Sequence, residues 1–152
     1  MAAGGRRFAA VAVAACLLAG CGGDDDGQAE RDRAYIEQVN VAVERFAREA
    51  RQLPSGFEVE TLRTYSAALD RTAERLRAID PPPAVARLHA QLADDVAVYA
   101  DAIEEAARAP LTEDADRVVA AQQDVMRATE TANSEVNRTL KAIGRRLDAQ
   151  SG

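Results

Sequence analysis

The sequence has few of the residues on which most metal and catalytic sites depend. It contains one histidine, two cysteines and no tryptophan among 152 residues. A zinc site built from several histidine or cysteine ligands is therefore excluded. The Glu-x-x-His motif of di-metal helical bundles is also absent, because Ala86 stands three residues before His89. With no glycine-rich phosphate loop and no nucleophile elbow, the sequence predicts no catalytic residues, no metal and no cofactor, and hence a protein that is not an enzyme.

Basic residues are outnumbered, with 19 Lys and Arg against 25 Asp and Glu, and the formal net charge is −6. Two of the arginines, Arg6 and Arg7, lie in a leader that we expect to be removed, which makes the remainder more acidic. An acidic surface is repelled by phosphate backbones and by anionic lipid headgroups. The charge balance therefore argues against nucleic acid as a partner and against electrostatic docking to a membrane.

Long apolar runs are also scarce, and the clearest one extends from Phe8 to Ala19 directly after Arg6 and Arg7. At about a dozen residues it is shorter than the roughly 20 that a transmembrane helix needs. A positive start, a short apolar run and a small-residue end are the three regions of a secretory signal peptide. The sequence therefore predicts that residues 1–20 are a signal peptide that export removes.

The end of this run carries a short motif, Leu18-Ala19-Gly20-Cys21. It resembles the lipobox of bacterial lipoproteins at all four positions. The resemblance implies that Cys21 becomes the lipidated N-terminus, with diacylglyceryl and palmitate chains as membrane anchor, since two acyl chains suffice for stable attachment. It places the protein at the extracytoplasmic side of the cell membrane. The alternative is an ordinary signal peptide that ends near a cysteine.

Residues 21–29 contain no large apolar side chain and include three consecutive aspartates, Asp24 to Asp26. Consecutive carboxylates in a glycine-rich coil have no imposed geometry, so a metal site is not expected there. We interpret residues 21–29 as the lipidated cysteine with a flexible acidic tether, followed by one folded domain over residues 30–150.

The folded domain shows apolar residues at spacings of three and four in segments that Pro54, Pro81–Pro83 and Pro110 separate. Such spacing is typical of amphipathic helices, and proline ends them. We expect four helices, which extend from Glu30 to Leu53, from before Leu62 to Ile79, from Val85 to the residue before Pro110, and from Thr112 to about Leu147. The predicted fold is all-α, an antiparallel up-down four-helix bundle. An extended coiled coil that oligomerises is the alternative.

The junction between the second and third helices has a recognisable pattern of apolar and proline residues. It consists of Leu76, Ile79, Pro81, Pro82, Val85, Leu88 and His89. This stretch resembles small lipoproteins of high-GC actinobacterial genomes. The resemblance implies a helical bundle and a surface location, but it brings no activity and no functional residues with it.

The fourth helix has polar residues where its apolar stripe should continue. The stripe includes Val118, Val125 and Val136, and Gln122, Thr129 and Asn133 interrupt its middle. Polar groups inside a bundle need hydrogen-bond partners. The preferred interpretation is a small rotation of the helix that moves these three residues to its edge and turns Met126 and Ala132 inward. The functional alternative is a polar pocket between helices.

The only histidine, His89, stands beside Leu88 on the third predicted helix. We interpret it as a boundary residue or as the partner of a neighbouring carboxylate, in preference to a metal ligand. The functional hypothesis is a lipid-anchored extracytoplasmic helical bundle that binds an envelope protein or a small ligand. A structural envelope spacer or oligomer without a ligand is the alternative.

Overall fold

A computed structural model describes residues 26–54, 58–108 and 115–150, and over these residues the chain is helical and contains no strand. The all-α prediction is therefore confirmed for the described residues. The signal peptide, Cys21 and Asp24 lie outside the described residues, as does the side chain of Val118. The helices are α1 (Asp26–Arg51), α2 (Val59–Arg77), α3 (Ala86–Arg108) and α4 (Ala115–Asp148).

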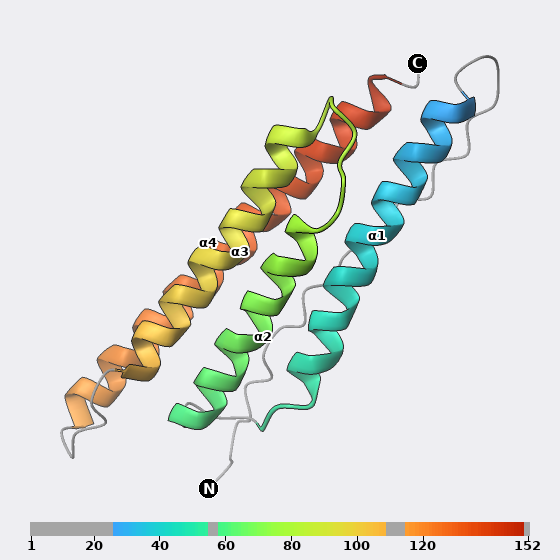
Figure 1. Cartoon of the computed structure of the whole chain (residues 1–152). Coiled ribbons are helices and arrows are strands. Elements are labelled where there is room, and N and C mark those ends of the chain that lie inside the picture. Colours follow the sequence, from blue (N-terminus) through green and yellow to red (C-terminus); the bar gives the residue numbers. More distant parts are fainter. Residues whose placement is uncertain (1–25, 55–57, 109–114, 151–152) are drawn as a thin grey trace, which may run out of the picture.

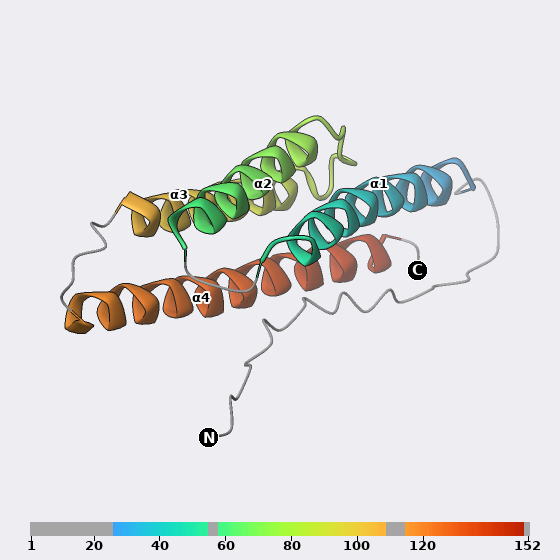
Figure 2. The same cartoon turned by 90° about the horizontal axis from the view of Figure 1, so that it is seen from below.

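The four helices lie lengthwise beside one another (Figures 1 and 2). Helix α2 has extensive contacts with α3 and fewer with α1, and α3 also packs against α4. Because α2 and α3 form the largest contact, their apolar faces supply most of the core. None of the helices in the described part of the chain is both long and apolar enough to cross a membrane.

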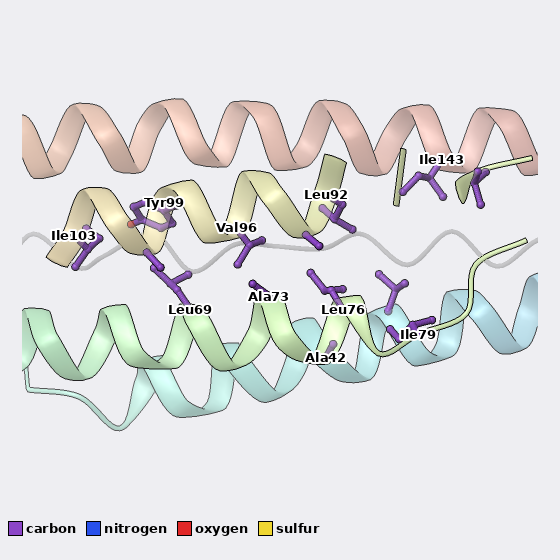
Figure 3. Close-up of a cluster of buried hydrophobic side chains, with 14 of the residues drawn as sticks. Ala42, Leu69, Ala73, Leu76, Ile79, Leu92, Val96, Tyr99, Ile103 and Ile143 are labelled. Carbon is purple, nitrogen blue, oxygen red and sulfur yellow. The ribbon is translucent and has the colours of Figure 1, made fainter. Parts of the chain in front are cut away.

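The core follows the apolar stripes of the sequence. Side chains of Leu92, Val96 and Ile103 on α3 point toward Leu69 and Leu76 on α2 (Figure 3). Leu76, Leu92 and Ile103 are each only 1% exposed. Burial of one such side chain stabilises the fold by roughly 1.5 to 3 kcal/mol, so interhelical packing accounts for helices that would be marginal alone.

The first helix begins earlier than expected. α1 starts at Asp26 and not at Glu30, so residues 26–29, which we assigned to the tether, are helical. Side-chain bonds within the first turns explain this extension, since Gln28 donates to Asp32 at 2.9 Å and Arg31 donates to Gln28 at 3.2 Å. Such contacts at spacings of three and four stabilise a helix end.

Two backbone hydrogen bonds and one buried side chain fix the turn between α2 and α3. Ile79 donates its N–H to the carbonyl of Leu76 at 3.0 Å, and Val85 donates to Pro82 at 3.0 Å. Val85 is fully buried, so it anchors the turn in the core. The prolines end α2 because they cannot continue a helix, and α3 begins directly after Val85.

Candidate functional site

A small cavity of about 60 Å³ lies where α1 and α3 end and α2 begins. All four helices or the residues directly after them contribute to its wall, which is mainly apolar with several hydroxyl groups. The lining residues are Leu53, Pro54, Thr61, Leu62, Tyr65, Tyr99, Ile103, Val125 and Thr129. Apolar walls with a few convergent polar groups are the usual makeup of a small-ligand site.

The hydroxyl groups of the cavity form a connected series. Thr129 donates to the carbonyl of Val125 at 2.8 Å, so its Oγ1 accepts from Tyr99, whose hydroxyl lies 2.8 Å away. The hydroxyls of Tyr99 and Tyr65 are 3.5 Å apart, which is long for a bond between two hydroxyls. Tyr65 therefore remains able to donate a stronger hydrogen bond to another acceptor.

The tyrosine rings are held by edge-to-face contacts. Tyr65 meets Phe46 with ring centroids 5.5 Å apart and meets Tyr99 with centroids 6.0 Å apart. The interplanar angles of 65° and 77° match the favourable arrangement of aromatic quadrupoles. The three rings come from α1, α2 and α3, so the hydroxyl of Tyr65 is positioned by packing across three helices.

The electrostatics of Tyr65 favour a neutral hydroxyl. Burial raises the pKa of Tyr65 far above its ordinary value, and the adjacent Tyr99 raises it further. A phenol that stays protonated at all physiological pH values acts as a hydrogen-bond donor and not as an anion or nucleophile. The cavity is thus suited to hold a ligand by shape and one or two hydrogen bonds.

The residues that the sequence singled out on α4 lie in different surroundings. Thr129 lines the cavity, whereas Gln122 and Asn133 are half-buried and do not line it. A rotation of α4 would turn Met126 and Ala132 inward. Ala132 packs against the core, but Met126 is 48% exposed, so only Ala132 turns inward. A polar pocket formed by Gln122, Thr129 and Asn133 together stays a prediction.

The histidine has different surroundings from those expected. His89 is 4% exposed, so it is no boundary residue, and its hydrogen-bond partners are a phenol and a backbone carbonyl, not a carboxylate. Nε2 lies 2.8 Å from the carbonyl of Leu76, which can only accept, so Nε2 donates. Nδ1 then accepts from the hydroxyl of Tyr35 at 3.1 Å. Both ring nitrogens of His89 are engaged, and no group of described histidine, cysteine or acidic side chains is placed to hold a metal.

The sequence analysis did not predict one polar contact between helices, which joins Thr139 to Asp95. Thr139 on α4 is 2% exposed and donates to Asp95 Oδ2 on α3 at 3.2 Å. Desolvation raises the pKa of Asp95, while the hydrogen bond from Thr139 opposes that shift. The sequence carries a signal for this contact, because Thr139 lies one helical turn before the buried Ile143. Leu140, the apolar neighbour of Thr139, is only half-buried.

No protein-family model, curated protein or solved structure matches the chain.

Proposed function

We propose that the protein is a lipid-anchored extracytoplasmic helical protein that binds a small ligand in the cavity beside Tyr65. The anchor is the lipid on Cys21, added at the extracytoplasmic side of the cell membrane after removal of residues 1–20. The observation that carries the binding role is the hydroxyl of Tyr65, which lies in an apolar wall with only a 3.5 Å contact to Tyr99. A hydroxyl with only this long contact in an apolar cavity favours a ligand that offers it a hydrogen-bond acceptor.

The proposal includes the arrangement of the helices as an antiparallel up-down bundle. Packing of α1 on α2, of α2 on α3 and of α3 on α4 supports it, because neighbours in sequence are then neighbours in space. In that arrangement the cavity lies at one end of the bundle.

The size of the cavity limits the ligand. A volume of about 60 Å³ is well below the roughly 300 to 1,000 Å³ of sites that enclose a whole drug-sized ligand. Only a group of a few heavy atoms enters without repacking, such as a short branched alkyl group beside a carbonyl oxygen. The remainder of a larger ligand would lie outside, against Leu53 and Pro54.

A thermal-shift screen of the full chain against small carbonyl compounds tests the proposal, since a ligand that binds only the folded state raises the melting temperature. Compounds that raise it are then tested on Tyr65→Phe, which lacks the donor but keeps the ring. We expect Tyr65→Phe to weaken binding about tenfold, which corresponds to one hydrogen bond of about 1.4 kcal/mol.

A matched pair of threonine variants controls for helix effects. Thr129 and Thr64 each donate to the carbonyl four residues earlier at 2.8 Å, but Thr64 is exposed on α2, away from the cavity. Thr129→Val should weaken ligand binding, whereas Thr64→Val should not. The absence of any stabilising compound, together with concentration-dependent assembly in sedimentation, would contradict ligand binding and favour the structural spacer.

A further inference from the structure

A second hollow lies between α1 and α2, away from the cavity beside Tyr65. It is an open groove of about 470 Å³ that shares no lining residue with the cavity. Its wall is formed by α1 and by the last turn of α2 with the residues directly after it. The two helices lie side by side (Figure 1). Its volume falls in the range of about 300 to 1,000 Å³ that is usual for ligand sites.

Arg75 on α2 lines the groove with a guanidinium that is only partly satisfied. Its Nη2 donates to Glu49 Oε1 at 2.9 Å, but Nη1 is buried and has no hydrogen-bond partner among the described residues. A guanidinium stays charged at all relevant pH values, so it cannot relieve this lack by losing a proton. A buried charged donor without a partner is costly, and a carboxylate is a strong acceptor for a guanidinium.

The charge around the groove favours an anion. Glu49 binds both Arg71 and Arg75, each at 2.9 Å, so a single carboxylate serves two guanidinium groups. Arg45 also lines the groove, and it forms no ion pair within the described part of the chain. The carboxylate of Glu37 offsets part of this charge. One positive charge remains in excess, which suits a monoanion better than a dianion.

The rest of the wall is apolar. Ala42 and Ile79 are buried along the groove, while Val41 on its α1 side is 48% exposed. We propose that the groove binds an amphiphilic monocarboxylate, whose carboxylate meets Arg75 and Arg45 and whose aliphatic chain lies along Val41 and Ile79. This site is independent of the function proposed for the cavity.

Isothermal titration calorimetry on the full chain in detergent at neutral pH tests the site with three probes. Hexanoate carries the carboxylate and the chain, 1-hexanol carries the chain alone, and inorganic phosphate carries charge alone. We expect hexanoate to bind at least tenfold more tightly than either of the other two, because 1-hexanol lacks the charge and phosphate lacks the aliphatic chain. Equal binding of 1-hexanol would overturn the role of the arginines, and equal binding of phosphate would overturn the role of the chain.

Variants then locate the binding. Arg75→Gln should weaken hexanoate binding about tenfold or more, since a hydrogen bond to a charged group is lost. Arg77→Gln is the matched control, because Arg77 lies on the same helix, pairs with Asp94 and does not line the groove. Should Arg75→Gln fail to fold, the exposed Arg45→Gln takes its place, with a severalfold loss expected. Unchanged hexanoate binding in a folded Arg75→Gln or in Arg45→Gln would refute the site. Thr129→Val alters the other cavity, so it should leave hexanoate binding unchanged.

Discussion

The hydroxyl of Tyr35 lies 3.1 Å from Nδ1 of His89, and this contact joins α1 to α3 inside the protein. The rings meet edge to face with centroids 5.5 Å apart. Through Nε2 the same imidazole reaches the carbonyl of Leu76 at 2.8 Å, so His89 links three helices. α1 has fewer contacts with its neighbours than α3 has. The link through His89 is therefore important for holding α1 in place.

Replacement of His89 by leucine should destabilise the fold. The change leaves the buried hydroxyl of Tyr35 without an acceptor, at a cost of about 1 to 3 kcal/mol. Urea unfolding followed by circular dichroism measures the loss. In a Tyr35→Phe background the same change should cost clearly less, because no hydroxyl is left unpaired. Equal losses in both backgrounds would show that the two side chains are not coupled.

Stability should fall at alkaline pH because of Tyr35. Burial raises the pKa of Tyr35 from 10.0 to about 12. The folded state thus holds the proton more tightly than the unfolded state. The resulting stability is fully present below pH 10 and is lost as the pH rises through about 12. The expected loss is about 2 to 3 kcal/mol, from 1.36 kcal/mol per pKa unit.

The control for this alkaline loss is Tyr35→Phe, which has no hydroxyl to ionise. Tyr65 also has a raised pKa and contributes to the alkaline loss in both proteins. The difference in urea midpoint between wild type and Tyr35→Phe should therefore narrow as the pH rises from 9 to 12. A constant difference over this range would contradict the assignment to Tyr35.

Asp95→Asn should stabilise the protein at neutral pH. Desolvation raises the pKa of Asp95 in the folded state above its unfolded value of 3.8. The stability gained from this shift is fully present below pH 3.8 and is lost as the pH rises through the pKa of the folded state. Asparagine keeps an oxygen for Thr139 without the charge. The gain should be up to about 1 kcal/mol, since Asp95 is half-buried and solvent screens it. A urea midpoint at pH 7 that is equal to or below that of wild type would contradict this prediction.

Asp94→Asn is the neighbouring control for Asp95. The Asp94 side chain is 69% exposed and pairs with Arg77 on the surface at 3.1 Å. Exposed pairs contribute little, so this change should be neutral or weakly destabilising. A gain as large as that of Asp95→Asn would point to overall charge and not to desolvation.

The helices could be predicted from sequence because prolines and apolar spacing are local signals. The apolar spacing includes Tyr35, Leu76 and Ile103, and each is buried. The cavity could not be predicted, because it depends on how far the helices stand apart, which the period of a single helix does not fix. The bonds from Tyr99 to Thr129 and from Thr139 to Asp95 each join two helices, so they depend on a register between helices that no local pattern encodes.

Gly144→Ala should stabilise α4. Gly144 lies inside the helix, and apart from its chain neighbours and the backbone of its own helix a Cβ at this position would meet no atom within 4 Å. Alanine reduces the conformational freedom of the unfolded chain, so the expected gain is about 0.5 to 1 kcal/mol. Gly27, which is equally unobstructed, lies at the second residue of α1, where helices fray. Gly27→Ala should therefore raise the melting temperature less than Gly144→Ala. The reverse order would contradict this reasoning.

The proposed lipid anchor gives the most direct test of where the protein resides. In the proposed anchoring the thiol of Cys21 accepts the diacylglyceryl group, so Cys21→Ser should abolish labelling with radioactive palmitate and shift the protein from the detergent phase to the aqueous phase. Cys16→Ser is the matched control, because Cys16 lies within the apolar run of the expected signal peptide and would be removed with it. Its product should label and partition like wild type. Aqueous partitioning of wild type, or palmitate labelling of Cys21→Ser, would refute anchoring through Cys21.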